Sequence, residues 1–162
     1  MGRFATGVTV VTYNCDGTPA GLTANGFMSV SMDPPLVVIS IRKESRFAQH
    51  VSVGSSYGVN LLAERQQHLS VHFGGRADPD LQPDFWRHDD LMMLADCLGY
   101  VVASVVEIVP AGDHLLYLGA IKHLELGSDA APLLFFGGRY KRLQAHMPAN
   151  YLYDSFGVGL GW

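Results

Sequence analysis

Side chains that could hold a flat polar ligand or a phosphate group are concentrated at residues 23–33. Hydroxyl groups, an amide and a glycine are interspersed there with larger apolar residues, in the order Thr23-Ala24-Asn25-Gly26-Phe27-Met28-Ser29-Val30-Ser31-Met32-Asp33. Hydroxyls and amides donate and accept hydrogen bonds, and glycine lets a backbone come close to a ligand. From these residues alone, a Ser/Thr-rich hairpin beside a core strand is an equally good interpretation.

A second polar stretch, residues 40–46, could bind an anion. It carries two hydroxyls and three basic side chains, in the order Ser40-Ile41-Arg42-Lys43-Glu44-Ser45-Arg46. Ser45 is suited to cap a short helix over 44–51, and exposed amides at a helix start beside an arginine favour a phosphate. When the basic side chains are considered alone, ordinary surface charge is the simpler interpretation.

Three histidines elsewhere in the chain could take part in ligand or metal binding. His114 follows Gly112-Asp113 between two predicted strands, where the pattern alone indicates a turn and a surface histidine. His68 and His72 lie one helical turn apart and could share a face as metal ligands. No acidic or cysteine third ligand accompanies them at useful spacing, which favours a solvated helix face. We predict no metal site.

The elements that must position these groups are mostly strands. β-branched and aromatic runs predict strands over 7–13, 20–25, 36–41, 56–61, 100–109, 115–126 and 133–136. Residues 27–33 alternate in polarity as in a half-buried strand, and the run 36–41 is apolar on both faces, as at the centre of a sheet. Tight turns join most neighbours, so we expect a mainly β, antiparallel closed or split barrel in a single domain over 1–162.

Short helices complete the expected fold. They are predicted over 44–51 and over 64–73, the second ending at Gly74-Gly75. Residues 76–90 are expected to be irregular, as a lid or dimer arm or as a charged surface loop.

Composition excludes several classes of protein. The chain has 162 residues and a formal net charge of −4, which argues against nucleic acid or an anionic membrane as a partner. No apolar run approaches the length of a membrane span, so we expect a cytoplasmic protein. Cys15 and Cys97 stand alone in the sequence and are expected to be free thiols.

Three ordered motifs resemble the flavin reductase-like, FMN-binding split-barrel family. They are Phe4-Ala5-Thr6-Gly7-Val8-Thr9-Val10-Val11-Thr12, the stretch 23–35 ending in Asp33-Pro34-Pro35, and Gly112-Asp113-His114 with Gly138-Arg139-Tyr140 after it. The resemblance implies an antiparallel Greek-key split barrel with short flanking helices. Its members include the small NAD(P)H:flavin oxidoreductases that serve two-component monooxygenases. One departure is Gly26, where the family commonly has serine.

The resemblance also assigns roles to site residues. It implies that the flavin ring edge is held by Thr23, Ala24 and Asn25, and that Ser29, Val30 and Ser31 lie on the ribityl and phosphate side. Ser40 precedes the basic stretch, in which Ser45 and Arg46 would contact the phosphate. His114 would position the nicotinamide, and Arg139 and Tyr140 would close the site from the other side.

The implied activity is hydride transfer from NADH or NADPH to FMN or FAD, supplying reduced flavin to a separate monooxygenase. In such chemistry the two cofactors react and the protein orients them, so no general acid or base is needed. The family implies a homodimer with flavin near the interface. The alternatives are an FMN storage or sensing protein and an oxidase of the pyridoxamine-phosphate type, and Gly112-Asp113-His114 favours the reductase.

Overall fold

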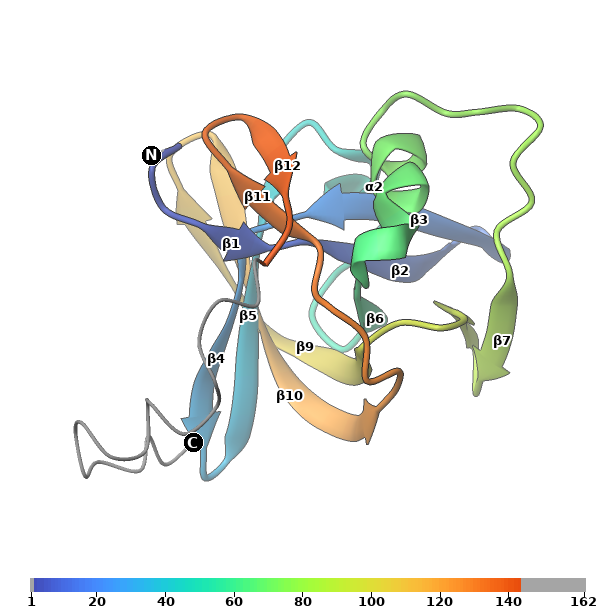
Figure 1. Ribbon diagram of the computed structural model, residues 1–162. Coiled ribbons are helices and arrows are strands. Elements are labelled where there is room, and N and C mark those ends of the chain that lie inside the picture. Colours follow the sequence, from blue (N-terminus) through green and yellow to red (C-terminus); the bar gives the residue numbers. More distant parts are fainter. Residues whose placement is uncertain (1, 144–162) are drawn as a thin grey trace.

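A curved antiparallel sheet forms the body of the molecule (Figure 1). The computed structural model describes residues 2–143, and the rest of the predicted domain over 1–162 lies outside the described residues. The strands of this sheet are β2 (Thr9–Cys15), β3 (Thr18–Ala24), β4 (Phe27–Met32), β5 (Pro35–Arg42), β6 (Ser56–Leu61), β9 (Gly99–Ala111) and β10 (His114–Leu126). They are ordered β3-β2-β6-β9-β10-β5-β4, and β3 also contacts β5 because the sheet curls on itself. The predicted mainly β, antiparallel fold is confirmed.

Smaller elements cover this sheet (Figure 1). A three-stranded sheet joins β1 (Thr6–Gly7), β11 (Leu134–Phe136) and β12 (Arg139–Lys141), and a hairpin pairs β7 (Phe85–His88) with β8 (Leu91–Leu94). The helices are α1 (Arg46–His50), the single 3₁₀ turn η1 (Glu64–Gln66) and α2 (Gln67–Phe73), which lies against β2 and β3. Among the described residues, no helix has the length and apolarity that crossing a membrane requires.

The interior of the curved sheet is filled by aromatic side chains around Phe47. Phe47 of α1 is fully buried and packs edge to face against three tyrosines, with ring centroids 4.9 Å from Tyr13, 6.1 Å from Tyr57 and 5.0 Å from Tyr117. Edge-to-face contacts add to the free energy gained by burying such large apolar rings. The short helix α1 is therefore held in place by one side chain that belongs to the main core.

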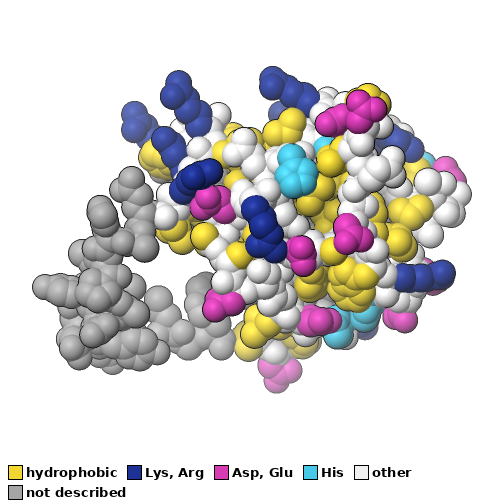
Figure 2. Space-filling view, turned by 45° about the vertical axis from the view of Figure 1, so that its right-hand side comes forward, with side chains coloured by type: hydrophobic (Ala, Val, Ile, Leu, Met, Phe, Trp, Pro, Cys, Tyr) yellow, Lys and Arg dark blue, Asp and Glu magenta, His cyan; other side chains and the backbone are white. Residues whose placement is uncertain are grey.

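A second core lies on the outer side of the sheet, under α2 and the β7–β8 hairpin. Leu69 of α2, Met93 of β8 and Leu133 are buried together with Val8 and Tyr100. Trp86 of β7 packs edge to face on Tyr100, with ring centroids 5.3 Å apart. This second core attaches the hairpin to the barrel. On the face of the molecule drawn in Figure 2, hydrophobic side chains are interspersed with charged ones and histidines.

The prediction that residues 76–90 are irregular was wrong in its last part. Phe85–His88 form β7 and pair with Leu91–Leu94, a strand that the sequence analysis did not predict. Both strands are only four residues long, and the turn between them lacks a glycine: Asp89 itself takes the left-handed conformation, with φ of 49°. An aspartate can do so, but this turn has no strong sequence signal.

The central strand predicted at 36–41 lies instead next to the sheet edge. β5 is flanked by β10 and by β4, which is an edge strand. Val37, Ile39 and Ile41 are buried, whereas the alternate residues are less so. The strand predicted at 27–33 is confirmed as β4, but its expected half-burial is wrong for a single chain, because most of its residues are exposed.

Most other elements agree with prediction apart from their ends. Ser45 caps α1 as expected, accepting a hydrogen bond from the backbone N–H of Ala48 at 3.1 Å. The strand predicted over 100–109 extends to Ala111 as β9, with Pro110 opposite Leu115, so the turn before His114 consists of Gly112-Asp113. The predicted helix over 64–73 is divided into η1 and α2, and β12 was not predicted.

Gly119 of β10 provides a test of the barrel packing. A Cβ at this position would overlap the Tyr57 hydroxyl and lie 3.0 Å from the Cβ of Ala103. We expect Gly119→Ala to lower the free energy of unfolding by about 1–3 kcal/mol. Denaturant unfolding measures the change.

The matched partner for this test is Tyr57→Phe. The Tyr57 hydroxyl is buried without a hydrogen-bond partner among the described residues, so its removal alone should cost little. In the double variant part of the loss caused by Gly119→Ala should be recovered. Full additivity of the two changes would show that the clash is not with Tyr57.

Candidate functional site

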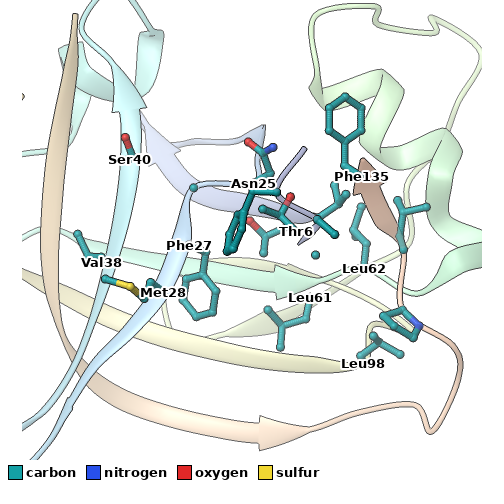
Figure 3. A pocket seen from close by; sticks show the side chains of 18 of the residues that line it. Thr6, Asn25, Phe27, Met28, Val38, Ser40, Leu61, Leu62, Leu98 and Phe135 are labelled. Carbon is teal, nitrogen blue, oxygen red and sulfur yellow. The ribbon is translucent and has the colours of Figure 1, made fainter. Parts of the chain in front are cut away.

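A large cavity, called the main cavity below, opens between β1, β4 and β5 (Figure 3). Its volume is about 740 Å³, which lies within the usual range for ligand pockets. Most of its wall is apolar, and Phe27, Val38 and Leu61 are among the lining residues labelled in Figure 3. Such a wall suits a flat, largely apolar ring system.

A few polar residues line this main cavity. Thr6 Oγ1 is buried and has no hydrogen-bond partner among the described residues. Asn25 and Ser40 also line the cavity, and the N–H of Ser40 donates to the carbonyl of Gly26 at 2.8 Å. A Cβ at Gly26 would lie only 3.0 Å from the Cβ of Ser40, so glycine permits this close approach of β4 to β5. These groups could satisfy the polar edge of a bound ring.

An adjoining cavity of about 490 Å³ shares Asn25 with the main one. Thr23 and Tyr140, both predicted site residues, line it. The Thr23 hydroxyl donates to the carbonyl of Ser70 at 2.7 Å, and the Tyr140 hydroxyl lies 2.8 Å from Ser70 Oγ. Two guanidinium groups complete this wall, from Arg42 and Arg76. The cavity is therefore suited to an anion.

Ser45 and Arg46 line a third cavity, of about 580 Å³, beside β3 and the end of α2. Arg46 Nη2 donates to Cys15 Sγ at 3.3 Å, and the remainder of its side chain is exposed. The structure thus divides the predicted phosphate contacts from the predicted ring contacts: these two residues lie in a different cavity from Asn25 and Ser40.

His114 lies at the start of β10, directly opposite Arg42 of β5. Its Nδ1 is 2.8 Å from Asp113 Oδ1, and because an ionised carboxylate only accepts hydrogen bonds, Nδ1 is the donor. The pKa of Asp113 lies below its usual value, because its carboxylate accepts this hydrogen bond and another from the backbone and lies near positive charge. Nε2 of His114 makes no hydrogen bond within residues 2–143. Arg42 connects this position with the adjoining cavity.

Other predicted site residues lie apart from these cavities. Ser29, Val30 and Ser31 are on the edge strand β4, and Ser31 is opposite Leu36 at the far end of β5 from Arg42. At about 3.3 Å per residue the two ends are about 20 Å apart, so one chain does not bring Ser31 together with Ser45.

The two remaining predicted site residues, Ala24 and Arg139, line none of the three cavities described above. Ala24 is buried at the end of β3, where its carbonyl accepts a hydrogen bond from Thr9. Arg139 is exposed on β12 next to Tyr140.

The sequence analysis missed Thr6 and Arg76. Thr6 is inside the first motif but was not singled out, and only its buried, unpartnered hydroxyl draws attention to it. Arg76 follows the Gly74-Gly75 helix end, and its place beside Arg42 depends on how α2 packs against β3. No local pattern predicts that placement.

Comparison with known proteins assigns the family. The model described as "Flavin reductase like domain" matches residues 1–144. This chain belongs to the flavin reductase-like domain family. It is 38% identical over 148 residues to the NADH-dependent flavin reductase of a Rhodococcus species, covering 89% of this chain and 83% of the relative. It is 32% identical over 143 residues to the reductase component of 4-hydroxyphenylacetate 3-monooxygenase from Thermus thermophilus, covering 88% and 92%.

A solved structure agrees. The NADH:FAD oxidoreductase SgcE6 of Streptomyces globisporus C-1027, in complex with NAD and FAD fragments, superposes with a TM-score of 0.82 at 29% identity, covering 91% of this chain and 90% of that one. The predicted family, the antiparallel split-barrel fold and a flavin oxidoreductase are confirmed. The main cavity fits a flavin, because its wall is apolar and Thr6 Oγ1 needs a partner.

Arg46 offers a direct test of the predicted phosphate contact. We expect Arg46→Ala to weaken flavin binding about tenfold, or ~1.4 kcal/mol, through the loss of one charge-assisted hydrogen bond at an exposed site. Fluorescence titration of FMN and FAD measures the dissociation constants. Arg87→Ala is the matched control, because Arg87 is exposed on β7 and pairs with Asp90. An unchanged constant for Arg46→Ala, with weakened binding for Arg42→Ala, would instead place the phosphate in the adjoining cavity.

Proposed function

We propose that this flavin reductase transfers a hydride from NADH to FMN or FAD and that the reduced flavin serves a separate monooxygenase. The observation that carries the proposal is the apolar main cavity together with the Thr6 hydroxyl, which has no hydrogen-bond partner among the described residues. Bound flavin supplies the hydride acceptor. Relatives whose names specify NADH support this co-substrate over NADPH, and a relative that is the reductase component of a monooxygenase supports the separate partner.

In this proposal the protein binds the flavin and NADH and orients them for hydride transfer. Phe27 and Val38 supply the wall against which the ring lies, and Asn25 and Ser40 supply hydrogen-bonding groups at its polar edge. His114 is a positioning residue: Asp113 fixes the imidazole through Nδ1, and Nε2 is free to hold the nicotinamide carboxamide or a phosphate.

Steady-state NADH consumption separates this function from the alternatives. A reductase oxidises NADH continuously when FMN or FAD is added in excess, whereas a storage or sensing protein binds flavin without turnover. An oxidase of the pyridoxamine-phosphate type would consume oxygen with its own substrate and no NADH. Absence of flavin-dependent NADH oxidation would contradict the proposal.

His114→Ala tests the nicotinamide contact. Loss of an orienting hydrogen bond costs about 1–3 kcal/mol, so flavin reduction by NADH should slow about five- to a hundredfold while flavin affinity changes little. Anaerobic stopped-flow reduction over a range of NADH concentrations measures the rate. His68→Ala is the control, because His68 is an exposed histidine whose Nδ1 lies 3.2 Å from the Arg65 carbonyl. If the variant reduces flavin at the wild-type rate at every NADH concentration, His114 has no role beyond the turn. If flavin affinity is lost instead, His114 belongs to the flavin site.

We also propose a homodimer that forms across β4. Three apolar side chains of this edge strand are exposed: Met28 by 60%, Val30 by 46% and Met32 by 68%. Within residues 2–143 no strand pairs with the outer edge of β4, and an edge with apolar side chains is suited to a second chain. Such an interface would cover Ser29 and Ser31, which lie away from the cavities of a single chain. A cytoplasmic location is likewise proposed, supported by the two free cysteines.

Met32→Lys tests this interface. A lysine charge in the contact should shift the protein from dimer to monomer at micromolar concentration in sedimentation velocity. Val53→Lys is the matched control, because Val53 is 61% exposed but lies outside β4. A wild-type monomer in the presence of flavin, or a dimer that survives Met32→Lys, would contradict the proposal.

A further inference from the structure

We propose that Cys15, Asp16 and His50 form a binding site for a thiophilic divalent metal ion such as zinc. One ligand atom of each residue lies within 4.8 Å of the other two, and within residues 2–143 this is the one group of three such side chains that could hold a metal. Thiolate, carboxylate and imidazole are the usual zinc ligands. None of the three residues lines the apolar cavity proposed for the flavin ring, but Cys15 lines the third cavity beside Ser45 and Arg46.

The spacing of the ligand atoms is close to that of a tetrahedral centre. His50 Nε2 lies 3.3 Å from Asp16 Oδ2. In a tetrahedral zinc site with bonds of about 2.0–2.3 Å, neighbouring ligand atoms are about 3.3–3.7 Å apart. The His50–Asp16 edge therefore already has the required length, and Cys15 Sγ needs to approach by at most about 1.5 Å, because it lies within 4.8 Å of the other two ligand atoms.

His50 has the orientation typical of a metal-bound imidazole. Its Nδ1 lies 2.7 Å from the carbonyl oxygen of Arg46 and donates to it, since a carbonyl can only accept. With Nδ1 donating to this carbonyl, a neutral imidazole leaves its Nε2 lone pair for a metal that lies between His50 and Asp16. Zinc-binding histidines commonly use the same arrangement, because a partner on the second nitrogen holds the ring in place.

Two well-anchored elements supply the ligands. Cys15 ends β2, and Asp16 occupies the following turn with φ of 52°, where the Asn14 side chain accepts from the N–H of Gly17 at 2.7 Å. His50 ends α1, which the buried Phe47 fixes to the barrel core. A metal would therefore join the β2–β3 turn to α1 without moving the backbone far.

Charge is balanced at this site. A Cys15 thiolate and the Asp16 carboxylate together neutralise a divalent ion, and the neutral imidazole adds no charge. Arg46 Nη2 donates to Cys15 Sγ at 3.3 Å, and a metal-bound thiolate can keep such a hydrogen bond, because sulfur has several lone pairs. With three protein ligands, a fourth position stays open to water.

The sequence did not predict this site because its ligands come from two separate elements. The pair considered there, His68 and His72, shares no third ligand among the described residues, and His72 Nδ1 accepts a hydrogen bond from the N–H of Asp78. The prediction of no metal site followed from spacing along the chain. The fold, however, brings His50 next to Cys15.

Cobalt is the probe for the first experiment, since Co²⁺ substitutes for zinc and its thiolate complexes absorb in the near ultraviolet. Titration of the full chain with CoCl₂ should give this charge-transfer band with one ion per chain, and ZnCl₂ should remove it. Cys15→Ser should abolish the band. His50→Gln and Asp16→Asn should weaken binding by about tenfold or more; asparagine keeps the left-handed turn available.

Two variants serve as matched controls. Cys97→Ser removes the other thiol, whose pKa burial raises to about 12, so it should leave the band unchanged. His68→Gln removes a histidine with the same Nδ1 contact to a backbone carbonyl, and should also have no effect. Circular dichroism without metal checks that each variant folds.

Thermal unfolding gives a readout that does not depend on absorbance. ZnCl₂ should raise the melting temperature of the wild type and of both controls, and should raise that of His50→Gln and Asp16→Asn clearly less at the same zinc concentration. The proposal is overturned if wild type gives no thiolate band at millimolar cobalt, if the band survives Cys15→Ser, or if it depends on Cys97 or His68. Because His50 and Asp16 are at the surface, their variants decide the question even if Cys15→Ser does not fold.

Discussion

The packing of Phe47 into the tyrosine-lined interior is the interaction on which the functional surface depends. α1 has five residues, too few to be stable as an isolated helix, so tertiary contact must hold it. Phe47 provides that contact against Tyr13, Tyr57 and Tyr117. Everything on this helix is then placed by the core, including Arg46 beside Cys15 and His50 beside Asp16.

The two-residue period of β5 connects this core to the cavities. Val37, Ile39 and Ile41 point into the barrel, so the alternate residues face the other way. Among these, Val38 and Ser40 line the main cavity and Arg42 lines the adjoining one. One strand thus carries an apolar wall, a hydroxyl and a cation in sequence along a single face. A one-residue slip would bury Arg42 and expose the core.

Structural features that depend on a few neighbouring residues were predicted correctly from the sequence. β-branched runs located the long strands, and Ser45 was recognised as a helix cap because its hydroxyl can reach the Ala48 N–H. The β7–β8 hairpin was missed, since its four-residue strands and Asp89 turn carry weak signals. The place of β5 next to the edge strand β4 was missed as well, because nothing local distinguishes such a strand from a central one when both of its faces are apolar.

The sequence predicted many residues of the candidate site but not how they are arranged in space. Four of the predicted residues line the main cavity or the adjoining one: Thr23, Asn25, Ser40 and Tyr140. Residues Ser29–Ser31 lie on the edge strand β4, away from both cavities. Such separations depend on strand register and on the curvature of the sheet, which no short motif encodes. The same reason explains why Arg76 and the cluster around Cys15 emerged only from the structure.

A crystal structure of the protein with bound FMN tests the central claim most directly. The account predicts that the isoalloxazine ring occupies the cavity between β1, β4 and β5, against Phe27 and Val38, with Thr6 Oγ1 newly hydrogen-bonded. Ring density elsewhere, for example in the surface pocket beside Trp86 and Tyr100, with the main cavity holding only water, would contradict it.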